Sequence, residues 1–345
     1  MARTVADAGA RYYREAMLMG DTHWEEWLGR TAKDRQDVSD VVGVQPEQLS
    51  FLQNASLALN IIALTVGPGS RVLALDKEFP SCTTPFIRAG CELRFVQSDD
   101  TGFFDAKMLG GYLKLKPRVF VISSVQFANG FRANLGELGR LCRDNGILFV
   151  VDATQSIGAF PVNMIDDFID ALVFSGFKTA TAGYGVAVLA TTDTWPDIDP
   201  PLVGWRSSKN AWALENDRLD MHRSGVGHEM GHPAFPGIFS LGEAMRLLSQ
   251  TGIDAISSRI IGLATQLREG LENLDIAIRS HTEPEHFSGI VLADVERSDE
   301  LCCALRSQGV WTSSRDGGLR ISLHGYNSEA DIDRFLSVLD SIRKV

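Results

Sequence analysis

Five short apolar runs alternate with helix-like segments between about residue 45 and residue 190, and this alternation limits the folds open to the chain. The runs are rich in Val, Leu, Ile and Phe, as strands buried on both faces of a sheet should be, and they span residues 71–76, 92–97, 118–127, 147–153 and 171–177. The helical candidate at 135–146 ends in Asn-Gly, a typical helix stop. Such alternation predicts a mostly parallel sheet with helices on both faces.

The pattern changes near residue 240 and predicts a second, smaller α+β domain. Long helices are expected over 240–274 and short strands at 288–295 and 318–324, followed by a last helix that Ser328 could cap. We therefore expect an α/β fold whose large domain spans residues 16–240 and whose small domain combines residues 1–15 and 241–345.

Charge and composition exclude several classes of protein. The 345 residues carry a formal charge of −11, so nucleic acid and anionic membranes are not expected partners. No apolar run approaches the ~20 residues needed to cross a bilayer. The five cysteines form no CxxC or CxxH pattern, which predicts reduced thiols, a cytoplasmic protein and no metal site.

An acid and an amine follow two of the predicted strands. Asp152 ends one apolar run, and Lys178 follows another inside a Ser-Gly-Phe-Lys turn. Ligands of parallel sheets bind beyond the carboxyl ends of the strands, so both side chains are expected to face one cleft. A cleft lysine can form a Schiff base, and a buried aspartate needs a cationic partner. Pyridoxal phosphate meets both needs, with its aldehyde and its protonated ring nitrogen.

A phosphate-binding element is also present. The turn Gln-Asn-Ala-Ser, residues 53–56, enters an apolar helix. The free amides at the start of that helix, together with Ser56, could hold an anion. One chain thus has candidates for the three groups that this cofactor requires.

These motifs resemble a known family. VVDATQSIGAFPVN followed by SGFK resembles the signature of class V aminotransferases, the fold-type I pyridoxal-phosphate enzymes that include cysteine desulfurases, isopenicillin N epimerase and kynureninase. The likeness extends through NASLALN, EFPS, SSVQFANGFRANL, EMGHPAFPGIFSL and LRISLHGYNSEADID, which is nearly the whole chain. It implies the fold-type I architecture, pyridoxal phosphate as cofactor and a homodimer with shared active sites.

The resemblance assigns roles to individual residues. Lys178 would form the Schiff base and then act as the base at Cα, and Asp152 would pair with the ring nitrogen. The remaining cofactor contacts would come from Gln155 at the phenolic oxygen, Phe79 stacked on the ring, Ala55, Ser56 and Ser175 at the phosphate, and His232 at the neighbouring subunit's phosphate. Arg320 would clamp the substrate carboxylate, in a pocket also lined by Asn54, Phe127 and Trp205, the last from the partner subunit.

Other interpretations remain open for these side chains. Lys178 alone would be read as an exposed loop lysine, and Asp152 as a helix N-cap. Phe79 and Trp205 could simply be packing residues, and Arg320 a structural ion-pair partner.

The sequence departs from the family pattern at three places. Desulfurases carry a nucleophilic cysteine shortly before the final arginine-containing strand, and residues 311–322 contain none. Cys302 and Cys303 lie earlier, in a predicted helix, so a persulfide-forming desulfurase is not expected. Phe177 replaces a His or Tyr that contacts the phosphate, and His232 replaces a threonine.

The predicted function is therefore a pyridoxal-phosphate enzyme that acts on an amino acid or amine through a Cα carbanion. An aminotransferase or a β-eliminating C–S lyase is the first expectation, and a kynureninase-like hydrolase or an epimerase is the alternative. A non-catalytic ligand-binding relative of the same fold is a third possibility.

Overall fold

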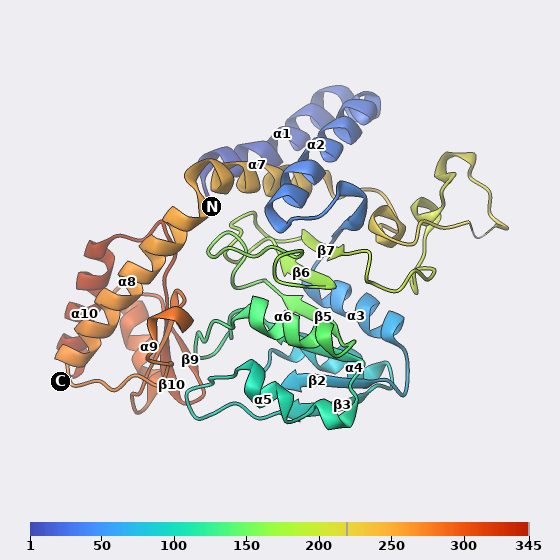
Figure 1. Cartoon of the computed structure of the whole chain (residues 1–345). Helices are drawn as coiled ribbons and strands as arrows, with labels where there is room; N and C mark the ends of the chain where they lie inside the picture. The colour runs from blue at the N-terminus through green and yellow to red at the C-terminus, as the bar shows by residue number, and fades with distance from the viewer. Residues whose placement is uncertain (219, 344–345) are drawn as a thin grey trace.

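The computed structural model describes residues 1–218 and 220–343, and it has a large and a small α/β part (Figure 1). The large part is built on a seven-stranded sheet with the order β1-β7-β6-β5-β4-β2-β3. Its strands are β1 (Leu49–Leu52), β2 (Arg71–Leu75), β3 (Glu92–Val96), β4 (Val119–Ser123), β5 (Leu148–Asp152), β6 (Ala171–Ser175) and β7 (Ala187–Thr191).

The predicted parallel strands are confirmed, and the sheet extends further than the sequence indicated. Strands β2 to β6 pair in parallel, as expected. Strand β7 runs antiparallel to β6 and to β1, and neither β1 nor β7 was among the predicted strands. Strand β1 has only four residues, too few to show a periodic pattern.

Helices cover both faces of this sheet (Figure 1). Alternate residues of each strand point to opposite faces, so Val119 and Val121 pack toward α3 and α4 in one apolar cluster, whereas Phe120 and Ile122 pack in another. The helices of the large part are α1 (Arg3–Met19), α2 (Trp24–Val42), α3 (Ala55–Val66), α4 (Thr84–Arg88), α5 (Ala106–Gly110), α6 (Leu135–Asp144) and α7 (Phe235–Thr251).

The small part has its own sheet and its own apolar core. Strands β8 (Ile290–Ala293), β10 (Gly318–Ser322) and β9 (Ser313–Arg315) pair antiparallel in that order. Helices α8 (Ile253–Asn273), α9 (Ser298–Ser307) and α10 (Glu329–Arg343) pack against them, with a core that runs from Leu263 to Leu339. Val5 of α1 joins the core of the large part. The predicted domain limits stay a prediction.

Among residues 1–218 and 220–343, no helix is both long and apolar enough to span a bilayer.

Candidate active site

Lys178 lies in a tight turn that follows β6. Gly176 in this turn lies so close to Val186, the residue before β7, that a Cβ atom there would be 2.8 Å from Val186 Cγ1. The carbonyl oxygen of Lys178 accepts a hydrogen bond from the Thr181 amide at 2.9 Å, which fixes the other end of the turn. Burial, reinforced by the positive charges of Arg320 and Arg315, lowers the pKa of the Lys178 amine. A larger fraction of this amine is thus neutral at a given pH than for an exposed lysine.

A cavity of about 220 Å³ opens beside the lysine. The structure brings three of the predicted site residues, Gln155, Lys178 and Arg320, to its wall. Arg320 Nη1 donates to the carbonyl oxygen of Phe127 at 2.7 Å, whereas its buried Nε atom has no hydrogen-bond partner within residues 1–218 and 220–343. Burial and the charge of Arg315 lower the pKa of Arg320. The cavity therefore presents two positive groups and one unused donor, as a carboxylate ligand would require.

Asp152 ends β5, and its carboxylate is buried, with 5% of the residue exposed. Its Oδ1 accepts from the Thr154 amide at 2.9 Å, and its Oδ2 lies 3.6 Å from the Cys82 thiol. No ion pair to it is found in the described part of the chain, and burial raises its pKa. No helix begins here, so Asp152 is not a helix N-cap. A buried carboxylate that lacks a cation suits a ligand that brings one.

The predicted phosphate-binding residues lie together where α3 begins. The Ala55 amide donates to Ser175 Oγ at 3.0 Å, and the Ser56 hydroxyl pairs with that of Ser81 at 2.7 Å. The Asn54 side chain accepts from the Leu57 amide at 2.8 Å, so it caps the helix. The amide of Ser56, in the first turn, has no intrahelical acceptor.

Phe79 is not a core residue, because it is 45% exposed. Its ring packs edge-on against that of Phe127, with the centroids 5.4 Å apart. Phe127 in turn supplies the carbonyl oxygen that Arg320 contacts. The two aromatic residues are thus connected to the arginine side of the cavity.

Sequence reasoning missed a second buried carboxylate, Glu78, whose charge interacts with that of Asp152. Glu78 Oε1 accepts from the Ser123 amide and from Gln126 Nε2, each at 2.7 Å, and Oε2 accepts from Ser123 Oγ at 2.6 Å. Burial raises the pKa of Glu78, and the charge of Asp152 raises it further. Glu78 is the first residue of the EFPS segment, one of the motifs that carry the family resemblance.

His324 also lines the cavity, and the sequence did not predict it as a site residue. Its Nε2 lies 3.1 Å from the carbonyl oxygen of Thr179, and its ring stacks on that of Tyr326 with the centroids 4.6 Å apart. Burial lowers the pKa of this imidazole.

Two predicted site residues lie elsewhere. The ring centroids of Trp205 and His232 are 5.2 Å apart, and those of His232 and Trp24 are also 5.2 Å apart. Neither lines the cavity beside Lys178. Their predicted roles require a second subunit and stay predictions.

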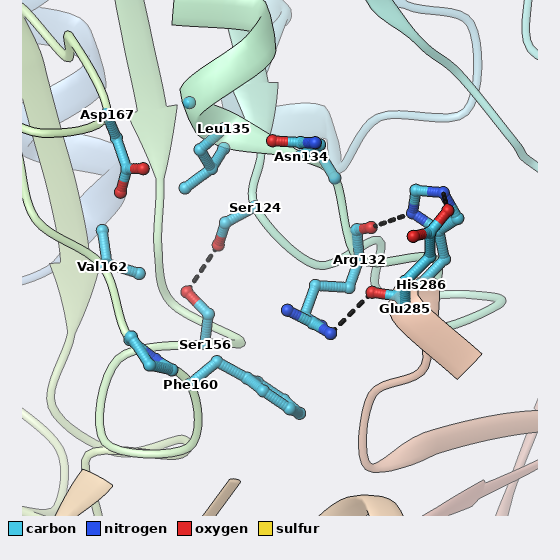
Figure 2. Close-up of a pocket in the computed structure, with 13 residues that line it drawn as sticks. Ser124, Arg132, Asn134, Leu135, Ser156, Phe160, Val162, Asp167, Glu285 and His286 are labelled. Carbon is cyan, nitrogen blue, oxygen red and sulfur yellow. Dashed lines mark hydrogen bonds and ion pairs between the residues drawn. The ribbon is translucent and has the colours of Figure 1, made fainter. Parts of the chain in front are cut away.

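A larger cavity, of about 380 Å³, neighbours the first (Figure 2). Phe160 lines both cavities. The hydroxyl groups of Ser124 and Ser156 face each other across 2.5 Å in this second cavity, and Arg132 contributes its charged group. Its lining contains no lysine, so the chemistry expected from the sequence belongs to the smaller cavity.

The residues around Lys178 fit pyridoxal phosphate. The lysine has a lowered pKa, which favours attack on an aldehyde, and Asp152 is a buried carboxylate without a cation. The start of α3 is suited to a phosphate, with Ser175 alongside it.

Over nearly its whole length, the chain is similar to several known proteins. A probable cysteine desulfurase of Pyrococcus abyssi is 26% identical over 337 residues, which cover 90% of this chain and 83% of that protein. The apo structure of cysteine desulfurase from Thermococcus onnurineus NA1 covers 100% of this chain and 92% of that one, with a TM-score of 0.91 at 24% identity. The structure of the cystine C–S lyase C-DES in complex with cysteine persulfide matches 99% of this chain and 94% of its own chain, with a TM-score of 0.88 at 21% identity.

The family model for aminotransferase class-V matches residues 3–335. This match confirms the predicted fold class. It also confirms the predicted cofactor, because class-V aminotransferases are pyridoxal-phosphate enzymes. On the sequence match, the shared fold and the residues around Lys178, this chain belongs to the class-V aminotransferase family.

Proposed function

We propose that this protein is a pyridoxal-phosphate enzyme that removes the Cα proton of a small amino acid, and that the reaction ends in β-elimination of a C–S bond. Transamination by the same site is the second candidate. The observation that carries the proposal is the cavity that holds the Lys178 amine beside Arg320, with an unpaired guanidinium nitrogen.

Each residue has a defined task in this proposal. Pyridoxal phosphate, when bound, supplies the electron sink that stabilises negative charge at Cα. Lys178 holds the cofactor covalently at rest and then moves the Cα proton with its Nζ atom. Asp152 keeps a proton on the ring nitrogen. The other contacts are Gln155 at the phenolic oxygen, Phe79 over the ring, and Ala55, Ser56 and Ser175 at the phosphate.

Arg320 binds the substrate carboxylate in the proposed complex. One of its nitrogens already holds the carbonyl oxygen of Phe127, which orients the guanidinium group. Asn54, Phe127 and the partner subunit's Trp205 would complete the substrate pocket.

The positions of the cysteines support an enzyme that forms no persulfide on the protein. Residues 313–322 form a β9–β10 hairpin without a cysteine. Cys302 is buried in the small core, and Cys303 is exposed on α9. Burial raises the pKa of Cys82 well above its usual range. Among the described residues, no cysteine lines the Lys178 cavity. Several relatives are nevertheless named cysteine desulfurases.

A homodimer with shared active sites, in the cytoplasm, is part of the proposal. Trp212 is 63% exposed and packs against Trp205, so an aromatic surface is available beside His232. In the dimer, His232 would contact the neighbouring subunit's phosphate. Neither nucleic acid nor a membrane is a proposed partner, because the chain is acidic.

The reaction is tested by mixing the holoenzyme with a panel of amino acids that includes cysteine, cystine and alanine. Elimination from cystine with uptake of water should give pyruvate, ammonia and cysteine persulfide in equal amounts. Accumulation of the pyridoxamine form would instead favour transamination. Alanine and a protein-bound persulfide as the products of cysteine would contradict the proposal.

Arg320→Lys is expected to lower kcat/KM by roughly 10- to 100-fold, mainly through KM. The lysine keeps the positive charge but loses the planar fork, and a hydrogen bond to a charged group contributes about 1.5–3 kcal/mol. Arg315→Lys is the matched control, because Arg315 lies on the adjacent strand and is exposed. Steady-state kinetics with the best substrate of the panel measure both variants. Equal kinetics for the two would remove Arg320 from the substrate site.

Replacing Cys302 and Cys303 together with alanine should leave more than about half of the turnover. Only a small cavity in the core of the small part is expected, with some loss of stability. Product formation per cofactor-loaded subunit is the measure. A folded, cofactor-loaded double variant without activity would restore the desulfurase interpretation.

A further inference from the structure

Two histidines and a glutamate gather where the small part meets the large part. One potential ligand atom from each of His281, Glu283 and His286 lies within 4.8 Å of the other two. The three residues fall in the segment His-Thr-Glu-Pro-Glu-His, which precedes β8. The two imidazole centroids are 5.2 Å apart.

Hydrogen bonds determine which nitrogen of His281 is available. The Thr101 hydroxyl donates its proton to Asp99 Oδ1 at 2.7 Å. The same hydroxyl lies 3.0 Å from His281 Nδ1, and its only proton is already committed. Nδ1 must therefore be the donor of this second bond, and in the neutral ring Nε2 carries the lone pair. Nε2 is buried and has no hydrogen-bond partner among the residues that the structure describes.

His286 is held in the same tautomer by a different partner. Its Nδ1 lies 2.9 Å from the carbonyl oxygen of Arg132, an atom that can only accept, as Figure 2 shows at the wall of the larger cavity. Nδ1 of His286 is again the donor, so Nε2 has the free lone pair. Histidines that bind metal ions usually donate their other ring N–H to a carboxylate, a backbone carbonyl or water. His286 donates to a carbonyl, and Thr101 connects His281 to the Asp99 carboxylate.

Carboxylates lie beside both free nitrogens. Glu283 Oε2 is 3.6 Å from His281 Nε2, and Glu285 Oε1 is 3.5 Å from His286 Nε2. Both separations exceed a good hydrogen bond, so they leave the imidazole nitrogens available. The histidine side chains are only 14% and 11% exposed, whereas that of Glu283 is 62% exposed and can move toward them.

We infer that His281, His286 and Glu283 form a binding site for a divalent transition-metal ion of the zinc type. Two neutral imidazoles and a carboxylate are ligands that Zn²⁺ accepts at about 2.0–2.2 Å, with water in the fourth position. A tetrahedral site would require the ligand atoms to approach one another more closely than the 4.8 Å within which they now lie. The inference does not depend on the proposed reaction at Lys178.

The bound ion would stabilise the contact between the small part and the large part. All three ligands belong to the segment before β8, whereas the groups that orient the histidines, Thr101 and the Arg132 carbonyl, belong to the large part. The His281 ring also stacks on that of Phe103 at 4.9 Å. Metal binding should accordingly stabilise the contact between this segment and the loop at residues 99–103.

The test uses tag-free holoenzyme that has been treated with a chelator and then titrated with Zn²⁺ against a chromophoric competitor. One tight equivalent per chain is expected, with Co²⁺ giving visible absorption typical of four ligands. His281→Gln, His286→Gln and Glu283→Gln should each weaken this equivalent at least about 10-fold. Thr101→Val, which removes only the group that orients His281, should weaken it by roughly 10- to 100-fold.

Matched controls separate this site from adventitious binding. His23→Gln removes a histidine that pairs with Glu26 on the surface, and Glu285→Gln removes the neighbouring carboxylate. Both should bind Zn²⁺ as the wild type does. Absence of a tight equivalent in the wild type would overturn the inference. So would equal binding by the His281, His286 and control variants, which would show that the histidines serve packing alone.

Discussion

Replacing Lys178 with alanine is expected to lower turnover at least about 10³-fold while the protein still folds and binds its cofactor without a covalent link. In the proposed function the same amine anchors the cofactor and moves the proton, so one substitution would remove both functions. The measurement is exchange of the substrate Cα proton for deuterium, followed by NMR. Lys209→Ala is the control, because Lys209 forms an exposed ion pair with Asp220. Wild-type exchange in the Lys178 variant would assign the base to another residue, with His324 the first to examine.

Reduction with borohydride gives an independent check of the same assignment. The reduced cofactor should be found on the peptide that contains Lys178. Because burial and two arginines lower the pKa of this amine, cofactor attachment to the apo-protein should reach its maximum rate at lower pH than for a free lysine. An adduct on a different lysine would contradict the site.

Asp152→Asn is expected to reduce turnover by roughly 10²-fold or more. Removing one partner of a buried charge pair costs about 3–5 kcal/mol, and here the partner would be the protonated ring nitrogen. Cofactor-saturated kcat is the measure, with the absorption spectrum as a readout of the ring's charge. A variant with wild-type kcat and spectrum would show that Asp152 does not touch the ring.

The same substitution should have the opposite effect on the stability of the cofactor-free protein. Burial raises the folded-state pKa of Asp152, so its contribution to stability is complete below the ordinary carboxyl pKa and is lost as pH rises through the raised value. Asp152→Asn abolishes that loss, so the apo-variant should be more stable than the apo wild type at neutral pH. Part of the pH dependence should persist, because Glu78 also has a raised pKa. Urea unfolding from mildly acidic to neutral pH tests this.

The sequence predicted those parts of the fold that are encoded by local pattern. The strands that end at Asp152 and Ser175 are continuous apolar runs, and such runs indicate buried parallel strands. Strand β9 is Ser-Ser-Arg, which has no apolar signal, and it exists because it pairs with β10. Its position depends on tertiary contacts that no local pattern encodes.

The site shows the same division between local and long-range information. Lys178, Gln155 and Arg320 were predicted from motifs, and the structure brings them to one cavity. The relation of Thr101 to His281 could not be predicted, since 180 positions separate the two residues. The prediction of no metal site rested on cysteine spacing and stays a prediction, because the metal site at His281 and His286 is itself a proposal. His232 and Trp205 do not line the cavity, and their predicted roles depend on a subunit interface that one chain does not reveal.

The pairing of β1 with β7 has a consequence for the order of folding. Leu49 pairs with Ala190, which lies 141 positions later in the chain. The β1–β7 pair can therefore form only after the intervening strands have been synthesised and have packed together. The helix that follows β1 brings the Ala55 amide within hydrogen-bond distance of Ser175 Oγ, so the proposed phosphate site would be complete only when this late pairing forms. During synthesis on the ribosome, the chain should therefore be unable to retain pyridoxal phosphate until β7 has emerged, and cofactor capture would mark a late step of folding.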